Sequence, residues 1–290
     1  MSFTSPAQTL ACAARSSRPR GRRSLASDDG AGSAHLARHT TSERLHAFLD
    51  PPGLESGLGR CLLRPRGLLC LDFDGTLVDG LQPEMPFVWP LLHAHFGTPP
   101  GQVEAMRIAF FSGQCTYEEW FNHDLRLLMA AGADRAGVKA ALAPLWPMSG
   151  VRETVIRIKA EGFVVAVLSG SVDTALDHFF PDVPFDEVLI NRLVFDQEGR
   201  LVGGIPTRFD VGAKADGLKY LKSRHGADWT VYVGDSFNDI AAARTADISI
   251  AFNCHDQELA SIATHVVPSP ARDLRAIIPL ILASVRGKWC

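Results

Sequence analysis

Short apolar runs alternate with helix-like stretches along the chain from Gly67 onward. The runs are nearly continuous in Val, Leu, Ile and Phe, which is typical of strands that are buried on both faces of a parallel sheet. We predict strands at 68–73, 164–168, 230–233, 248–252 and 265–267. We predict helices at 151–160, 213–224, 238–245 and 273–285, with a kink at Pro279 in the last. Strand–helix alternation of this kind predicts an α/β fold with a parallel sheet covered by helices on both sides.

Two further features interrupt this alternation. Gly203 and Gly204 follow an apolar run and a turn-like segment, which predicts a β-hairpin between the second and third main strands. Residues 81–146 show no strand pattern. They contain a helix at 116–131, which begins with a capping box formed by Thr116 and Glu119, and a second helix from Asp134 to Leu145.

The segment 81–146 is far longer than an ordinary strand-to-helix loop, so we interpret it as a helical cap inserted after the first strand. An insertion at the carboxyl end of a strand overhangs the edge where open α/β sheets bind ligands. The predicted catalytic core then consists of residues 67–80 and 147–290.

Residues 1–60 differ from the rest in being rich in Ser, Ala, Arg, Gly and Pro. Several arginines precede the first acidic residue, Asp28, a composition also found in organelle transit peptides. We favour a disordered N-terminal extension over organelle targeting by residues 1–27, and therefore expect a cytoplasmic protein.

Overall composition narrows the class of protein. The 290 residues carry a net charge of −3, which provides no global basic field for nucleic acid. No apolar run reaches the length needed to span a bilayer, so we expect no membrane partner. The six cysteines form no CxxC pair, which favours a reducing compartment. The sequence carries no signal for the oligomeric state.

Carboxylates follow the first predicted strand directly, in the stretch LLCLDFDGTLVDG. Asp72 and Asp74 are two positions apart and share a face of a regular strand, and Gly75 allows the backbone to turn away at once. Two carboxylates so close together repel each other and require a cation or a shared proton.

Three more segments place polar groups at strand ends. Ser169 lies in LSGS, where we predict the end of a strand and the start of a helix, an arrangement that suits an anion or simple N-capping. Lys214 lies near a helix start and is either an anion ligand or a surface lysine. Asp235 ends a strand in GDSFND and offers the oxygen ligands that Mg²⁺ prefers, although acids also favour a helix start by themselves.

Together, in this order, the segments DFDGT, SGS, AKADGLKYL and GDSFNDIAAA resemble the four motifs of the haloacid dehalogenase superfamily. Within it, the chain looks most like the phosphoserine phosphatase branch, a resemblance that includes the later AFN at 251–253. The resemblance implies a Rossmann-like core with a cap, and a Mg²⁺-dependent phosphatase acting on a small phosphorylated metabolite. Asp74 points to phosphate esters, because dehalogenases of the superfamily lack this second aspartate.

The resemblance also implies residue roles. Asp72 would be the nucleophile that forms an aspartyl phosphate, and Asp74 the general acid and base. Mg²⁺ would be held by the Asp72 and Asp235 side chains and the Asp74 carbonyl. The remaining expected roles are phosphate binding by Ser169, Gly170 and Lys214, and support by Asn238 and Asp239.

The chain departs from the phosphoserine phosphatases where those enzymes read the substrate's amino and carboxylate groups. Leu81 stands at the expected glutamate and Asp124 near the expected arginine, so Glu84 and Arg126 become the candidates. Possible substrates therefore include phosphoserine and other metabolites such as sugar phosphates. A phosphomutase and a non-enzymatic binding protein are the competing functions.

The cap also offers aromatic and histidine side chains. Phe110 or Phe111 could line an apolar wall of the cap, although we favour core packing for both. His93 and His95 should point apart on a helix, so they are no metal pair. His123 could face the site from the cap, although we favour a surface position.

Overall fold

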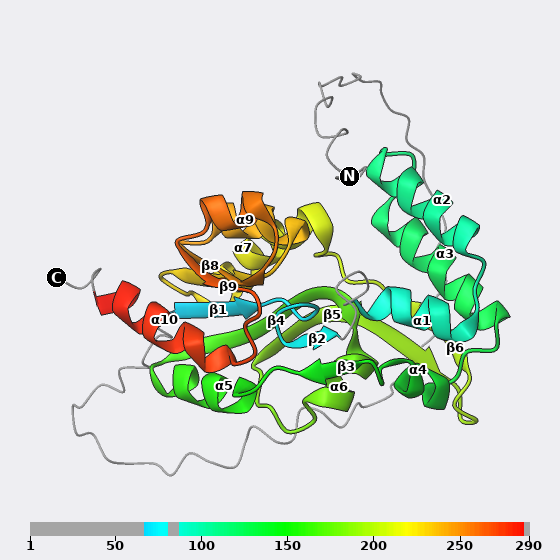
Figure 1. The fold of residues 1–290 in the computed structure, drawn as a ribbon, viewed down its shortest axis with the longest axis horizontal. Coiled ribbons are helices and arrows are strands. Elements are labelled where there is room, and N and C mark those ends of the chain that lie inside the picture. Colours follow the sequence, from blue (N-terminus) through cyan, green and yellow to red (C-terminus); the bar gives the residue numbers. More distant parts are fainter. Residues whose placement is uncertain (1–66, 81–86, 287–290) are drawn as a thin grey trace, which may run out of the picture. The chain divides into compact units, whose positions relative to one another are not determined.

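A seven-stranded sheet forms the centre of the molecule (Figure 1). This computed structural model describes residues 67–80 and 87–286. The strand order is β6-β5-β4-β1-β7-β8-β9, and every neighbouring pair is parallel except β5 with β6. The predicted parallel α/β fold is confirmed. The strands are β1 Gly67–Leu71, β4 Phe163–Val172, β5 Glu187–Phe195, β6 Leu201–Ile205, β7 Thr230–Gly234, β8 Ile248–Cys254 and β9 His265–Pro268.

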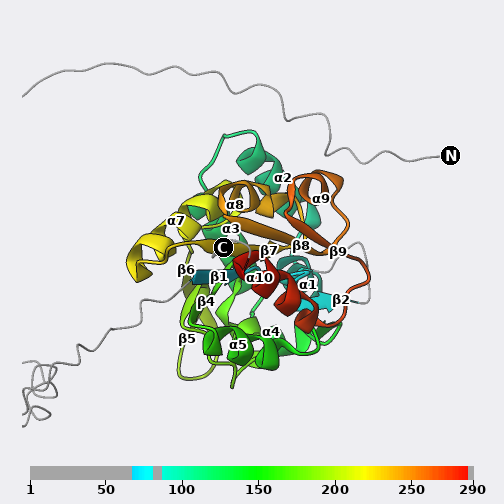
Figure 2. The ribbon, with the colours of Figure 1, turned by 90° about the vertical axis from the view of Figure 1, so that its left-hand side faces the viewer.

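Helices cover both faces of this sheet, α7 to α9 on one and α5 and α10 on the other (Figure 2). The bounds are α5 Val151–Ala160, α6 Asp173–Phe179, α7 Lys214–His225, α8 Ile240–Thr245, α9 Gln257–Ile262 and α10 Ile277–Arg286. Alternate residues of β1 supply the two cores: Leu69 and Leu71 pack into the cluster that contains α5 and α10, whereas Leu68 and Cys70 pack against α7. All five residues of β1 are buried, which explains the uninterrupted apolar run.

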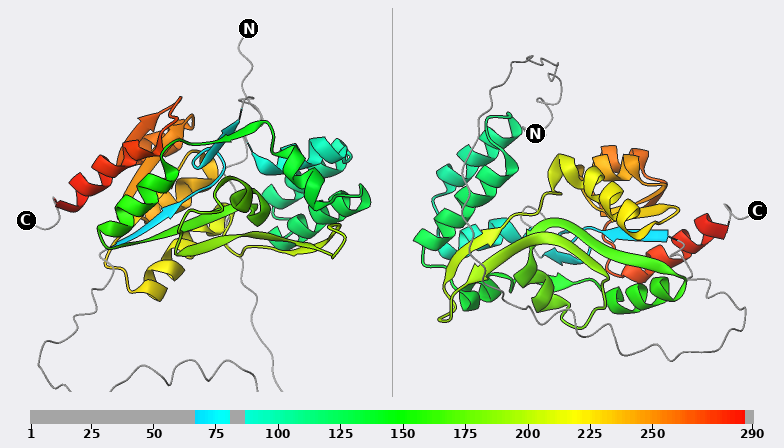
Figure 3. Two further views of the ribbon diagram at one scale, coloured as in Figure 1. Left: turned by 90° about the horizontal axis from the view of Figure 1, so that it is seen from below. Right: turned by 180° about the vertical axis from the view of Figure 1, so that it is seen from behind.

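Along the chain, four helices come between two short strands that do not belong to the main sheet, β2 Val78–Gly80 and β3 Leu145–Pro147. They are α1 Val88–Phe96, α2 Pro100–Phe111, α3 Tyr117–Ala130 and α4 Arg135–Ala141. Two further views show α2 and α3 lying alongside each other (Figure 3), and the rings of Phe110 and Trp120 join them with centroids 4.7 Å apart. α3 begins with the predicted capping box of Thr116 and Glu119. The division of the chain into core and cap stays a prediction.

Four details differ from the sequence-based expectations. A two-stranded antiparallel sheet joins β2 Val78–Gly80 to β3 Leu145–Pro147, so strand structure does occur within 81–146. For the same reason the helix capped by Asp134 ends at Ala141 rather than at Leu145. The final helix begins at Ile277, which places Pro279 in its first turn, where the proline need not kink it. The predicted hairpin is β5–β6, but Gly203 and Gly204 lie within β6 and not in the turn.

Residues 1–60 and Glu84 lie outside the described residues, as does Leu81. The predictions for an N-terminal extension, for targeting by 1–27 and for Glu84 therefore stay predictions. Within the described part of the chain, no helix combines the length and apolar character needed to cross a membrane.

Candidate active site

The site forms where three neighbouring strands end. Asp72 follows β1, Ser169 lies near the end of β4, and Asp235 follows β7; β4 and β7 flank β1. From β1 the chain builds β4, β5 and β6 on one side of the sheet and then crosses to β7, β8 and β9 on the other, and open α/β sheets bind ligands outside the strand ends where the strand order reverses in this way. The three side chains therefore lie at one edge of the sheet.

Asp72 and Asp74 leave β1 through a tight turn. The Asp72 amide still donates to the Val233 carbonyl at 2.9 Å, which extends the pairing of β1 with β7. Gly75 then adopts a φ of +76°, and a Cβ there would overlap the Asp235 carboxylate. Glycine is therefore needed both for the backbone conformation and for the close approach of Asp235. Asp72 is almost completely buried, and Asp74 nearly so.

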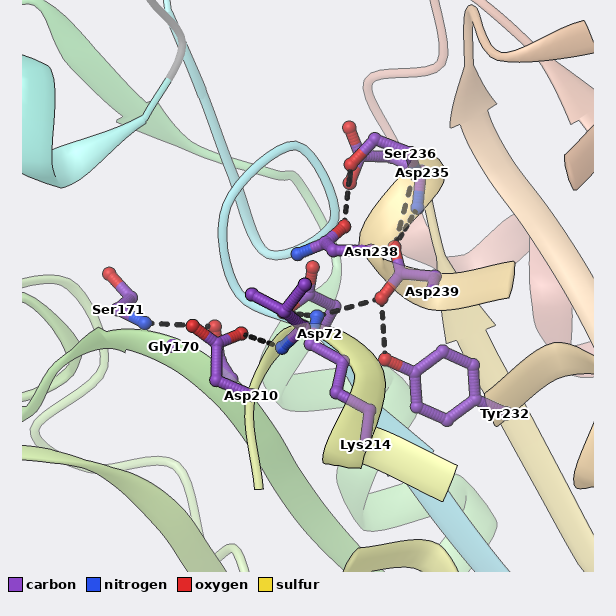
Figure 4. A network of polar contacts seen from close by, with 12 residues as sticks. Asp72, Gly170, Ser171, Asp210, Lys214, Tyr232, Asp235, Ser236, Asn238 and Asp239 are labelled. Carbon is purple, nitrogen blue, oxygen red and sulfur yellow. Dashed lines mark hydrogen bonds and ion pairs between the residues drawn. The ribbon is translucent and has the colours of Figure 1, made fainter. Parts of the chain in front are cut away.

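Lys214 is a buried cation in contact with two carboxylates (Figure 4). Its Nζ lies 2.9 Å from Asp72 Oδ1 and 2.7 Å from Asp239 Oδ1. Burial by itself would lower the pKa of Lys214, but the charges of Asp239 and Asp72 outweigh it and raise the pKa. The lysine is therefore charged, and the surface-lysine interpretation is wrong.

Asp239 holds Lys214 in place. Its carboxylate accepts hydrogen bonds from Lys214, from the Tyr232 hydroxyl at 2.6 Å, and from the amides of Asp235 and Ser236 at 2.9 and 3.2 Å. With both oxygens in use, Asp239 orients the lysine, in line with the supporting role expected for it. Tyr232 was not predicted, because its position within a buried strand gives no sign of a polar contact.

Asn238 lies at the edge of the site on the short turn 237–239. Its Oδ1 accepts a hydrogen bond from the Ser236 hydroxyl at 2.8 Å, which fixes the side-chain amide beside Asp235. Its expected supporting role stays a prediction.

The SGS segment belongs to β4 and is not a helix start. β4 continues to Val172, with an irregular register between Leu168 and Val172, and α6 begins only at Asp173. The Ser169 hydroxyl accepts a hydrogen bond from the Ser171 amide at 3.2 Å. The two interpretations that assumed a helix start here, an anion site and an N-cap, are therefore wrong in that assumption. Ser169 and Gly170 do line the cavity that contains Asp72.

The Gly170 carbonyl receives two donors from other elements. Trp89 Nε1 of α1 donates to it at 2.9 Å, and Asn191 Nδ2 of β5 at 2.6 Å. The same Asn191 amide donates to the Tyr117 hydroxyl of α3 at 2.8 Å. Neither Trp89 nor Asn191 was predicted, because their partner is a backbone carbonyl brought close only by the fold.

Three carboxylates could hold a metal ion. Asp72, Asp235 and Asp239 each offer an oxygen, and these oxygens lie within 4.8 Å of one another. Burial first, and then the Asp239 charge, raise the pKa of Asp72 to about 7 and that of Asp235 well above its usual value. A divalent cation would relieve this repulsion, and hard carboxylate oxygens suit Mg²⁺. Because Asp239 is saturated by other donors, Asp72 and Asp235 are the carboxylates that best fit a metal ion. The expected metal set of Asp72, Asp235 and the Asp74 carbonyl stays a prediction.

A cavity of about 440 Å³ lies above these groups. Asp72, Asp74, Ser169 and Asn238 line it from the core, and residues of α1, α2 and α3 complete the wall. Asp210 also lines it; this carboxylate precedes Lys214 by four positions and was not predicted.

Of the two residues expected to read the substrate, only Arg126 is described. Arg126 is exposed and does not line the cavity, whereas Asp124 and Arg107 do. Phe111 lines the cavity and is 45% exposed, so its expected core packing is wrong; Phe110 packs on Trp120.

The histidines follow their helical spacing. His93 is buried and lines the cavity, while His95 is exposed, so the two point apart as expected. His123 is partly buried, with Nδ1 3.2 Å from Asp124 Oδ1.

Comparisons with known proteins agree with this geometry. The family model "haloacid dehalogenase-like hydrolase" matches residues 67–247. The chain is 28% identical to phosphoserine phosphatase of Methanocaldococcus jannaschii over 221 residues, 75% of this chain and 99% of the relative. It is 30% identical to the phosphoserine phosphatase of Streptococcus thermophilus over 64% of this chain and 84% of the relative. It is 32% identical to phosphoserine phosphatase SerB2 of Mycobacterium tuberculosis, but spans only 45% of that longer protein.

A solved structure described as a phospho-aspartyl intermediate analogue of phosphoserine phosphatase superposes with a TM-score of 0.55 at 27% identity. The match covers 73% of this chain and 97% of that one. The chain therefore belongs to the haloacid dehalogenase-like hydrolase family, and within that family it resembles the phosphatases.

Proposed function

We propose that the protein is a Mg²⁺-dependent hydrolase of small phosphoric monoesters that works through an aspartyl phosphate on Asp72. The observation that carries this proposal is the environment of Asp72. Its carboxylate is buried at the cavity floor, paired with the charged Lys214, and two residues from Asp74. This set combines a nucleophile, a fixed positive charge and a proton donor.

Two displacements at phosphorus complete the reaction. An Asp72 oxygen attacks the phosphorus atom while the bond from phosphorus to the ester oxygen breaks. Asp74 gives its proton to that departing oxygen, and an alcohol leaves. Asp74 then takes a proton from water, whose oxygen attacks the phosphorus, and the bond from phosphorus to Asp72 breaks to release phosphate.

The charges around the site suit these roles. Burial, followed by repulsion from Asp72, raises the pKa of Asp74 to about 8, so that Asp74 carries a proton at neutral pH. Lys214 and Ser169 hold phosphoryl oxygens. When bound to Asp72 and Asp235, Mg²⁺ supplies positive charge that offsets the repulsion between the phosphate and the Asp72 carboxylate.

Phosphate release from p-nitrophenyl phosphate and a panel of natural monoesters tests the proposal, with Mg²⁺ and with a chelator. We expect turnover that needs Mg²⁺ and falls by at least about 10³-fold in Asp72→Asn, which keeps the shape of the side chain but not its charge. Asp216→Asn is the matched control, because it makes the same change on the exposed face of α7 and should be without effect. Full activity in Asp72→Asn would contradict the proposal.

The names of the relatives make phosphoserine the first natural substrate to test. A phosphomutase would use the same four motifs, and it is distinguished by its product. It would pass the phosphoryl group from the enzyme to a sugar phosphate and release little inorganic phosphate, whereas we expect water to be the acceptor.

A further inference from the structure

Aromatic side chains form much of the wall of the cavity that contains Asp72. The six used here are Trp89, Phe111, Tyr117, Trp120, Phe121 and Phe237. Their rings are in mutual contact: the centroids are 5.8 Å apart for Trp89 and Phe121, 5.9 Å for Phe111 and Trp120, and 6.1 Å for Phe111 and Phe237. A wall of this kind attracts organic cations, because the ring faces carry negative potential.

A carboxylate lies in the same wall. Asp124 of α3 is 5% exposed, and its nearest side-chain partners are two histidines, with His123 Nδ1 at 3.2 Å and His93 Nε2 at 3.5 Å. Among the described residues, no lysine or arginine lies within ion-pair distance of Asp124. Asp124 therefore adds negative charge to the aromatic wall.

Among the described residues that line the cavity, Arg107 is the one arginine or lysine, and it already forms an ion pair. Arg107 Nε and Nη2 each donate to Glu104 at 2.8 Å, and its guanidinium lies 5.7 Å from the centroid of Phe111. Glu104 also lines the cavity, so the two charges cancel within the wall.

The charges of the cavity wall would favour some phosphate esters over others, according to the charge of the leaving group. Phosphoserine carries an ammonium group and a carboxylate. The ammonium would meet Asp124 and the aromatic rings, but the carboxylate would meet the same negative wall, since Arg107 is paired with Glu104 and Lys214 is buried against Asp72 and Asp239. An amino alcohol ester has the cation without the carboxylate.

We propose that the enzyme selects monoesters of cationic amino alcohols that lack a carboxylate, through the aromatic rings and Asp124. Phosphoethanolamine and phosphocholine are the probes of this class. The proposal rests on the proposed phosphatase function and concerns the leaving group at the same site. At about 440 Å³ the cavity is within the range that small ligands occupy.

The first test compares kcat/KM of the full chain with Mg²⁺ on phosphoethanolamine, phosphocholine, phosphoserine, glycerol 3-phosphate and a sugar phosphate. We expect one of the two cationic esters to exceed each of the other three by at least about tenfold. Equal or faster turnover of phosphoserine, glycerol 3-phosphate or the sugar phosphate would overturn the inference while leaving the phosphatase proposal intact. Loss of all turnover, including that of p-nitrophenyl phosphate, would instead count against the phosphatase function.

Binding to Asp72→Asn separates the two proposals, because it needs no turnover. Calorimetry with Mg²⁺ should give tighter binding of phosphoethanolamine or phosphocholine than of phosphoserine. Tighter binding of phosphoserine would overturn the inference even in a chain that hydrolyses nothing.

Variants then assign the preference to residues. Asp124→Asn and Trp120→Leu should each reduce the ratio of kcat/KM between the preferred cationic ester and glycerol 3-phosphate by about tenfold or more. Glu118→Gln, on the exposed side of the same helix, is the matched control and should leave the ratio unchanged. If Asp124 only stabilises the histidines, both substrates will lose activity equally, and the unchanged ratio would contradict the proposal. A selective loss of phosphoserine turnover in Arg107→Gln would also contradict it, by showing that Arg107 reads a carboxylate.

Discussion

At the scale of residues, the site is organised around buried charges that depend on one another. Three donors other than Lys214 fix the Asp239 carboxylate, which holds the position of Lys214, and Lys214 in turn neutralises part of the charge on Asp72. Removing one member of a buried ion pair typically costs about 3–5 kcal/mol, because it leaves the partner charged and desolvated. The arrangement therefore links the stability of the folded chain to the protonation of the nucleophile.

This link predicts that stabilisation by Mg²⁺ depends on pH. The pKa values of Asp72 and Asp74 are raised from 3.8 to about 7 and about 8 in the folded chain. Their contribution to the free energy of unfolding without metal is therefore fully present below about pH 4, and is lost as the pH rises through about 7 to 8. Bound Mg²⁺ competes with these protons, so the increase in Tm on adding Mg²⁺ should be larger at about pH 8.5 than at about pH 5.

Thermal unfolding at both pH values, with Mg²⁺ and with a chelator, measures this effect. Asp72→Asn, which removes one of the titrating groups and one of the proposed metal ligands, should flatten the difference. A Tm increase that is equal or larger at about pH 5 would show that the raised pKa values are not coupled to metal binding.

The sequence was enough to place Asp72, Asp74 and Asp235 beyond strand ends and Lys214 at a helix start, because short apolar runs mark the strands. It could not indicate Tyr232 or Asn191, since both lie within strands and their polar partners belong to other elements. It also could not decide whether Lys214 is buried, because that depends on Asp72 and Asp239, which come from other parts of the chain.

At the scale of elements, α3 combines a local start signal with several residues of the cavity wall. Tyr117, Phe121 and Asp124 share one face of the helix and line the cavity, while the exposed Thr116 and Glu119 cap its N-terminus. This capping box was predictable from the sequence because Thr116 and Glu119 are three positions apart. The end of α4 was not, because Leu145 pairs with Gly80, a contact that the helical pattern does not contain.

Thr116→Ala should lower the free energy of unfolding by about 1 kcal/mol, because the Glu119 amide loses its acceptor. Urea titration measures the change. Ser112→Ala is the control: its exposed hydroxyl donates only to the Ala109 carbonyl near the end of α2, so the change should stay within about 0.5 kcal/mol. An equal effect of the two substitutions would mean that the capping box does not stabilise α3.

At the scale of the whole molecule, the sequence predicts that residues 1–60 are dispensable for catalysis. This segment is rich in Ser, Ala, Arg, Gly and Pro and shows little apolar periodicity. A chain that begins at residue 61 should keep the kcat, KM and Tm of the full chain within about twofold in rate and about 2 °C. A large loss of Tm or kcat would show that part of the segment packs on the described fold.

The Gly170 carbonyl has a consequence for how the enzyme discriminates among substrates. Trp89 and, through Asn191, Tyr117 connect two helices of the cavity wall to the strand that carries Ser169. A leaving group that fits the wall poorly would therefore also shift Ser169, which we propose holds a phosphoryl oxygen. We expect a poorly fitting ester to react more slowly once it is bound, so that selectivity appears in kcat in addition to binding affinity.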